Sequence, residues 1–188
     1  MKKYELIITD KIIYYGRALY RIKALKNFSD VEIGDLGGYV ESENNLSQEY
    51  NCWIYDNSKV FSTALVFDNA KIYGNAQVYG HAKVYDTARI FDNSKIYGDA
   101  RVYNTAEVYD NAKIYDDAKV YGNVRVLGQI FGDAQVCDNI EDYENLQVYA
   151  LVQVGSKDQI YGNAKIYNQL DLKKYLTKQR LVKAINYL

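Results

Sequence analysis

The sequence predicts an all-β protein in which very short strands are stacked as a regular coil. The first observation is compositional: the 188-residue chain contains 21 Tyr and no Pro. Aromatic side chains suit a pleated, half-buried surface, whereas Pro removes a backbone donor from a β-ladder. The second observation is a repeat, because residues 52–129 divide into thirteen consecutive six-residue units. Strands this short are not stable as isolated hairpins, so each is expected to pair with the equivalent strand of the next turn.

Each unit alternates in the manner of a strand and then turns. Position one is Ala in nine units and Ser in two, position three is Val or Ile in all thirteen, and position four is Tyr or Phe in twelve. Because side chains alternate between faces, positions one and three should point inward and positions two and four outward, over a strand of about four residues. Gly-Asn or Asp-Asn in positions five and six suits a turn with positive φ.

Residues 1–50 break this period and are predicted to form a small antiparallel β cap and a lead-in to the repeats. Three segments alternate like strands, with a turn at residues 15–17: Tyr4–Thr9, Lys11–Tyr15 and Ala18–Leu25. A solenoid needs such caps because its terminal coil otherwise exposes unpaired strands.

The repeat region is predicted to span residues 51–170. After Leu127 the pattern resumes two residues out of phase, in the units 128–133 and 134–139. Residues 171–188 then change to a helical spacing that includes Leu172 and Leu176, with Asp171 as the predicted N-cap. We expect this C-terminal α-helix to lie across the last coil and to cap it.

The repeats resemble those of the hexapeptide-repeat family. Its pattern, aliphatic-x-x-x-small-x, is met by Val78-Tyr79-Gly80-His81-Ala82-Lys83 and by its neighbours. The resemblance implies a left-handed parallel β-helix of triangular cross-section, with three units, or 18 residues, in each coil. The chain departs from the family in placing Tyr after the aliphatic residue, where a small or acidic residue is common.

A second resemblance concerns the segment that leads into the repeats. Residues 34–42 and 45–48 are similar to a segment that precedes the same repeats in small proteins of phage and prophage origin. This resemblance implies a phage- or prophage-derived protein, for which antagonism of a host defence component is a plausible task.

Composition argues against several functional classes. A formal net charge of −1 disfavours binding to nucleic acid or membrane through bulk positive charge, and no apolar stretch is long enough to span a membrane. Cys52 and Cys137 show no metal-ligand spacing and cannot form a disulfide framework, so we predict a cytoplasmic protein without a bound metal. No phosphate-binding loop or nucleophile motif is present, and no cofactor is predicted.

His81 is the single histidine and a weak candidate for a catalytic residue. The family resemblance implies, as an alternative, a coenzyme A-dependent acyltransferase in which a histidine at the interface of a trimer acts as general base. A general base needs a pocket and a group that orients it. Because His81 ends an uninterrupted unit, at a position where Asn is common, an ordinary turn residue is the favoured interpretation.

The outward positions two and four offer the most informative surface. Position two is Lys or Arg in nine units, so every third unit gives a face with cations beside aromatic rings. Such a face suits a protein partner or a stacked nucleotide. One face is therefore the predicted ligand- or partner-binding site: Lys83, Tyr85, Arg101, Tyr103, Lys119 and Tyr121. The alternative is that the tyrosines only stabilise the sheet and the lysines only keep it soluble.

These observations favour a non-catalytic binding protein whose partner is a host protein or a small, nucleotide-like anionic ligand. Corner acids such as Asp68 and Asp86 make an extended nucleic acid an unfavourable partner. Two alternatives stay open, a hexapeptide-type acyltransferase and a self-associating structural scaffold. A homo-oligomer, either a dimer or a trimer, is compatible with all three.

Overall fold

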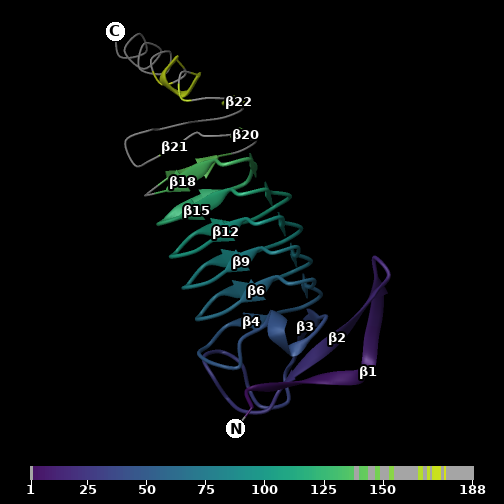
Figure 1. The fold of residues 1–188 in the computed structure, drawn as a ribbon. Helices are drawn as coiled ribbons and strands as arrows, with labels where there is room; N and C mark the ends of the chain where they lie inside the picture. Colours follow the sequence, from purple (N-terminus) through teal and green to yellow (C-terminus); the bar gives the residue numbers. More distant parts are fainter. Residues whose placement is uncertain are drawn as a thin grey trace.

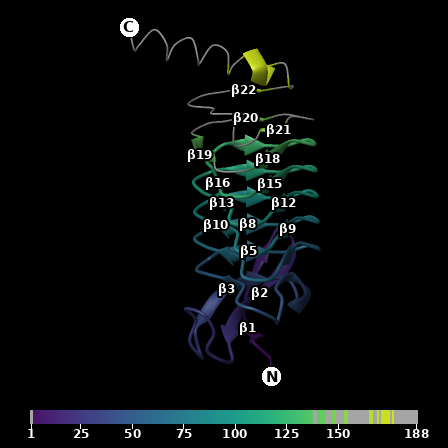
Figure 2. The same cartoon turned by 90° about the vertical axis from the view of Figure 1, so that its left-hand side faces the viewer.

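The protein is an all-β parallel solenoid with an antiparallel hairpin at its N-terminal end (Figure 1). The computed structural model describes residues 2–137, 140–143, 147–148, 153–154, 165–166, 169, 171–174 and 176. Expectations for the remaining residues, including the end of the predicted C-terminal helix, lie outside the described part. Three strands per coil stack into three columns, which Figure 2 shows from the side.

The first column continues the sheet of the N-terminal strands and contains β5 (Lys59–Val60), β8 (Gln77–Val78), β11 (Lys95–Ile96), β14 (Lys113–Ile114), β17 (Gln129–Ile130), β20 (Gln147–Val148) and β22 (Lys165–Ile166). The second column contains β4 (Trp53–Ile54), β7 (Lys71–Ile72), β10 (Arg89–Ile90), β13 (Glu107–Val108), β16 (Val124–Val126) and β19 (Ile140–Tyr143). The third contains β6 (Leu65–Val66), β9 (Lys83–Val84), β12 (Arg101–Val102), β15 (Lys119–Tyr121), β18 (Gln135–Cys137) and β21 (Gln153–Val154).

The register confirms the predicted coil of 18 residues. Lys83 pairs with Arg101, and Arg101 pairs with Lys119, in parallel. The phase slip after Leu127 is also confirmed, because Lys113 pairs with Gln129, only 16 residues on, and the later pair Gln129–Gln147 returns to 18.

The strands are shorter than predicted, and this changes the place of the aromatic residues. Most contain two residues rather than about four, namely positions two and three of each unit. Position four already enters the turn, so the rings stand at the corners of the coil instead of in the middle of a face. The inward positions agree with prediction, since the Ala, Val and Ile at positions one and three of the thirteen units in residues 52–129 have at most 1% of their surface exposed.

The N-terminal cap is confirmed as antiparallel. Strand β1 (Tyr4–Tyr14) pairs with β2 (Arg17–Ala24), and the turn between them has positive φ at Tyr15 and Gly16. Strand β2 pairs antiparallel with β3 (Leu36–Val40), and β3 pairs in parallel with β5. Parallel pairing therefore reaches back to β3, which joins the hairpin to the solenoid.

A short C-terminal helix is present, and it includes Gln169 and residues 171–174 and 176. Leu172 is buried and belongs to the solenoid core, and Leu176 packs against that core. Because Gln169 is already helical, Asp171 lies inside the helix and is not its N-cap. Among the described residues, no helix is long and apolar enough to cross a membrane.

Candidate functional site

The predicted binding residues lie together on the third column. Lys83, Arg101 and Lys119 follow one another in register on β9, β12 and β15. Their tyrosines form a continuous stack at one edge, with ring centroids 4.9 Å apart from Tyr85 to Tyr103 and from Tyr103 to Tyr121. The structure thus brings all six predicted residues onto one surface, and their role in binding stays a prediction.

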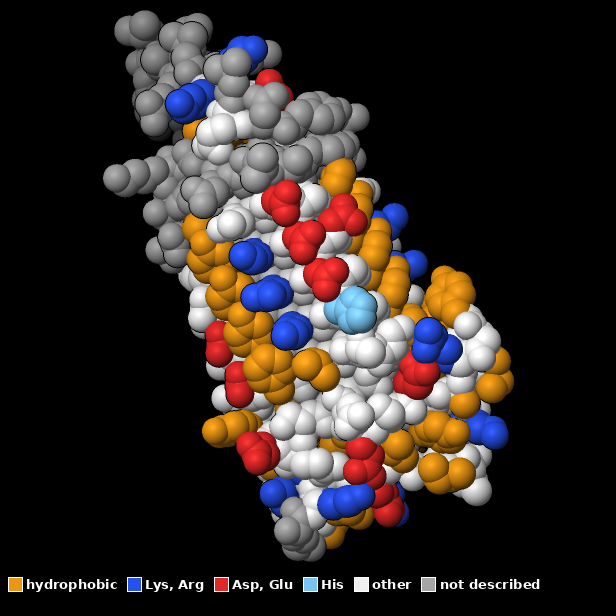
Figure 3. Space-filling model, viewed as in Figure 1, with side chains coloured by type: hydrophobic (Ala, Val, Ile, Leu, Met, Phe, Trp, Pro, Cys, Tyr) orange, Lys and Arg blue, Asp and Glu red, His pale blue; other side chains and the backbone are white. Residues whose placement is uncertain are grey.

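A second aromatic stack borders the same surface on its other side. It contains Tyr79, Tyr97 and Tyr115, again with centroids 4.9 Å apart. We call the area between the two stacks, over β6, β9, β12 and β15, the charged face. Figure 3 shows it as bands of basic and acidic side chains between two hydrophobic bands.

The tyrosines at the rim are neutral hydrogen-bond donors at ordinary pH. Burial among the stacked rings raises the pKa of Tyr79 to about 12 and also raises the pKa of Tyr85 and Tyr103. Each ring can therefore offer an apolar flank and a hydroxyl proton to a docking partner.

The acidic band on the charged face was missed from the sequence. Between coils, the backbone N–H of His81 donates to the carbonyl of Gly98, and the N–H of Asp99 donates to the carbonyl of Asp116. These bonds place the position-six residues Thr63, His81, Asp99 and Asp117 in one line along the solenoid. In the other two lines of position-six residues within residues 52–129, the residue is Asn, Thr or Gln. The signal was available, because among the thirteen units of residues 52–129 only those that end at 99 and 117 have an acid in sixth place, and the next unit, 128–133, ends in Asp133.

The corner aspartates in position five have a different role. They adopt positive φ, and the carboxylate of one coil accepts a backbone N–H from the next coil: Asp56 from Gly74 at 2.9 Å, Asp86 from Asn104 at 3.0 Å and Asp92 from Asp110 at 3.1 Å. These carboxylates are engaged in holding the coils together, so they are not a diffuse acidic surface.

The charged face keeps its cations available, unlike the second column. There, Lys71 is paired with Asp30, and Arg89 and Arg125 both lie within 4 Å of Glu107. Among the described residues, Lys83, Arg101 and Lys119 have no carboxylate within that distance. Asp99 and Asp117 are likewise outside every ion pair in the described part of the chain.

His81 is oriented by Thr63. The Thr63 hydroxyl donates to the carbonyl of Gly80 at 2.9 Å and lies 2.6 Å from Nδ1 of His81. When the Thr63 hydroxyl donates to the carbonyl, Nδ1 of His81 donates to Thr63, and in that tautomer of the neutral ring Nε2 keeps its lone pair free of this contact. His81 is exposed, so the ring is positioned without being enclosed.

Two open hollows meet at His81. One, of about 460 Å³, runs toward the hairpin and is lined by Arg17, Glu41 and Ser62, with Thr63, Gly80 and His81. The other, of about 350 Å³, lies on the charged face and is lined by Thr63, His81, Lys83, Asp99 and Arg101.

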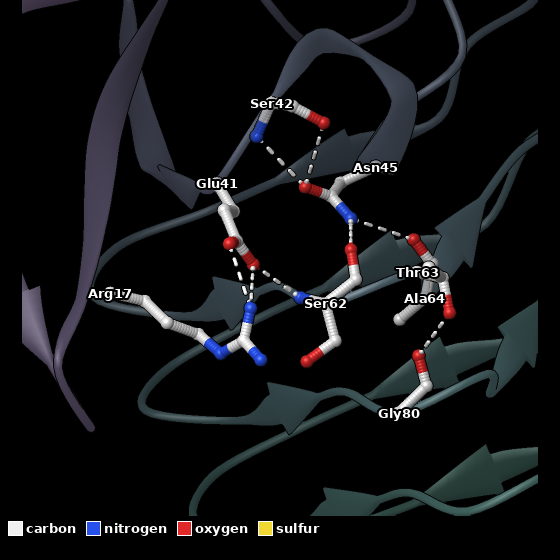
Figure 4. A network of polar contacts seen from close by, with 8 residues as sticks. All are labelled: Arg17, Glu41, Ser42, Asn45, Ser62, Thr63, Ala64 and Gly80. Atoms are coloured by element: carbon white, nitrogen blue, oxygen red, sulfur yellow. Dashed lines mark hydrogen bonds and ion pairs between the residues drawn. The ribbon is translucent and has the colours of Figure 1, made fainter.

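The wall of the first hollow is a fixed polar network (Figure 4). The Glu41 carboxylate accepts from Arg17 Nη1 at 2.8 Å and from the Ser62 backbone N–H at 2.6 Å. Behind it, the buried Asn45 amide donates to the carbonyls of Ser62 and Ala64, both at 2.9 Å. These contacts tie the hairpin and the lead-in to the first corner of the third column.

Cys52 is buried as predicted, but it has a basic neighbour that the sequence does not reveal. Nζ of the buried Lys3 lies 3.2 Å from its sulfur and donates to the carbonyls of Glu49 and Cys52. Burial lowers the pKa of Lys3 and raises the pKa of the Cys52 thiol. Neither charged form is favoured, so the pair fills the end of the core and does not supply a reactive thiolate.

Comparison with known proteins gives one partial similarity. No protein-family model matches the chain. Over 67 residues, 32% of this chain, it is 36% identical to the uncharacterized acetyltransferase YdcK of Escherichia coli (strain K12). The aligned part is 21% of that relative, so the chain spans about a fifth of its length. The similarity and the parallel solenoid fit a hexapeptide-repeat protein, and neither bears on a phage origin. Among the described residues, no group of three or more His, Cys, Asp or Glu is placed to bind a metal.

Proposed function

We propose that this protein is a non-catalytic binding protein and that the charged face is its docking surface for a partner protein. The observation that supports this is the availability of charge: Arg101 and Asp99 stand side by side on an exposed surface without an ion pair in the described structure. Arg and Tyr, as at Arg101 and Tyr103, are enriched in protein interfaces.

The mixed charge favours a protein over a small anion as the partner. A polyanionic ligand that contacts Arg101 and Lys119 would also meet Asp99 and Asp117 in the neighbouring column, which costs electrostatic energy. A protein surface can present both signs in the matching order. A host protein as the partner, and antagonism of host defence as the purpose, are parts of the proposal that rest on the phage resemblance alone.

The test compares two matched double variants. Arg101→Ala/Tyr103→Ala removes a cation and a ring from the charged face, and Arg89→Ala/Phe91→Ala removes the same pair of groups from the second column. Tagged forms of the wild type and both variants are used to capture proteins from the native host, and any captured protein is purified and its affinity measured by calorimetry.

We expect the charged-face variant to lose at least about tenfold in affinity, as is usual for central Arg and Tyr contacts, while the control binds like the wild type. Equal affinity of all three proteins for the captured partner would exclude the charged face as the docking surface.

Acyl transfer is a second candidate because His81 is oriented by Thr63 beside a hollow that contains Lys83 and Arg101. The similarity to an uncharacterized acetyltransferase points the same way. On this hypothesis Nε2 of His81 accepts a proton from the acyl acceptor. Calorimetry with acetyl-coenzyme A tests it: binding to the wild type, and acetyl transfer that His81→Ala abolishes, supports the enzyme. Absence of binding rejects it.

A further inference from the structure

We propose that the partner of the charged face is a second copy of this chain, docked in parallel about a two-fold axis that runs along the column. This inference rests on the proposed function, because it takes the charged face as a protein-docking surface.

The order of side chains across the charged face is self-complementary. One row reads Tyr97, Asp99, Arg101, Tyr103, and the next reads Tyr115, Asp117, Lys119, Tyr121. A corner residue, Gly98 or Asp116, separates the first ring from the acid, and buried Ala and Val separate the other side chains. From edge to edge, each row is therefore aromatic, acidic, basic, aromatic. Figure 3 shows the same four bands along the column.

A two-fold axis along the column reverses this order in the facing copy. Asp99 of one copy then lies opposite Arg101 of the other, Asp117 lies opposite Lys119, and each aromatic edge faces the other aromatic edge. A two-fold axis across the column keeps the order and places acid opposite acid, which is repulsive. Charge complementarity thus selects the parallel arrangement.

The row spacing allows both acid-and-base rows to match at once, while the row below them places Lys83 opposite His81 of the facing copy. The stacked rings are 4.9 Å apart along both edges, and the facing copy has the same spacing because it has the same coils. One correct contact between rows therefore sets the rest, and a shift along the column by one row would leave rows at the end unpaired.

The other two columns do not have this property. The position-six residues that precede β8, β11 and β14 of the first column are Asn75, Asn93 and Asn111, and those that precede β7, β10 and β13 of the second column are Asn69, Thr87 and Thr105. The cations of these two columns are therefore not bordered by a line of acidic position-six residues, which a second copy would need in order to pair with them. The hairpin β1–β2 also stands beside the solenoid rather than over the charged face (Figures 1 and 3).

The size of the face predicts a weak dimer. Seven residues from edge to edge span roughly 20 Å, and four rows at about 4.8 Å span about the same length. The flat area is on the order of 400 Å² per copy, below the roughly 800 Å² of a standard interface. The dimer should therefore dissociate on dilution and weaken as salt screens its ion pairs.

The experiment is sedimentation of the purified full chain from micromolar to millimolar concentration. The variants are Arg101→Glu/Lys119→Glu, which makes the face acidic, and Asp99→Lys/Asp117→Lys, which makes it basic. Lys95→Glu/Lys113→Glu is the control, because it makes the same charge change as the first variant on another column. Circular dichroism checks that each retains its β structure.

We expect the wild type and the control to dimerise, and each single-sign variant to weaken dimerisation about tenfold or more. An equimolar mixture of the acidic and basic variants should form a heterodimer. Orientation is tested in a Cys137→Ser background: chains with Asp99→Cys should form a disulfide with chains carrying Arg101→Cys, and not with one another.

A wild type that stays monomeric throughout, or a dimer that the single-sign variants leave unchanged, overturns the inference. Self-linked Asp99→Cys chains would overturn the parallel arrangement. If the wild type is monomeric and Arg101→Ala/Tyr103→Ala still loses affinity for a captured protein, the inference fails and the proposed function stands. If that variant also binds normally, both fail.

Discussion

At the scale of single residues, two serines occupy the inward position that Ala fills in most units. Both Ser58 and Ser94 are fully buried. The Ser58 hydroxyl donates to the carbonyl of Gly74 at 3.2 Å, whereas the Ser94 hydroxyl has no hydrogen-bond partner in the described part of the chain. A buried hydroxyl without a partner has lost its hydration and gained nothing in return.

Ser94→Ala should therefore raise the free energy of unfolding by about 1 kcal/mol, because it removes an uncompensated polar group. Ser58→Ala is the matched control, and it should be neutral or destabilising because a hydrogen bond is lost. Urea unfolding followed by circular dichroism measures both. A loss of stability in Ser94→Ala comparable with that of Ser58→Ala would show that the Ser94 hydroxyl is in fact satisfied.

At this scale the sequence predicted the interior well and the ends poorly. Strict placement of Ala and Val in every unit identifies inward residues because period two leaves no other choice. Lys3 contacts Cys52, which is 49 positions further along the chain. Asn45 contacts Ser62 and Ala64, which are 17 and 19 positions further along. No local pattern encodes such contacts, so sequence reasoning could not find these two buried polar side chains.

At the scale of elements, the aromatic stacks contribute to stability in a way that depends on pH. Burial raises the pKa of Tyr79 to about 12 and raises the pKa of Tyr85, Tyr97 and Tyr103 above 10.0. The folded chain holds these protons more tightly than the unfolded chain does. The contribution of these rings to the free energy of unfolding is therefore fully present below pH 10.0 and is lost as the pH rises from there through about 12.

Urea midpoints measured between neutral pH and pH 12 test this expectation. Midpoints should fall above pH 10.0. Burial lowers the pKa of Lys3, which adds stability as the pH rises toward that of free lysine, so the net fall is expected only above it. Midpoints that do not fall between pH 10.0 and about 12 would contradict the burial of the rings.

The strand lengths show what periodicity can and cannot specify. It predicted which residues face inward, but the ladder includes only positions two and three in most units. The reason is that position five adopts positive φ, which turns the chain at position four and places the ring at a corner. The two-residue slip after Leu127 was visible in the sequence because it interrupts an otherwise constant spacing.

At the scale of the whole molecule, all three columns of the solenoid carry cations and aromatic rings on their outer side, and the charged face also carries Asp99 and Asp117. Sequence reasoning identified the cations and rings of the charged face because they follow the repeat. It missed Asp99, Asp117 and Thr63, which orients His81, because these position-six residues are seen to be neighbours only when every third unit of the sequence is aligned. The wall made by Arg17 and Glu41 depends on how the hairpin folds back, which no repeat predicts.

The central claim is that the charged face is the docking surface, and hydroxyl-radical footprinting tests it most directly. The chain is oxidised in dilute buffer, at millimolar concentration in the same buffer, and in a lysate of the native host, and modification of each aromatic residue is measured by mass spectrometry. We expect Tyr85 and Tyr103 to be oxidised less at high concentration or in the lysate than in dilute buffer, with Tyr73 and Phe91 unchanged. Protection of Tyr73 and Phe91 instead, or equal oxidation of all four rings in all three conditions, would contradict the claim.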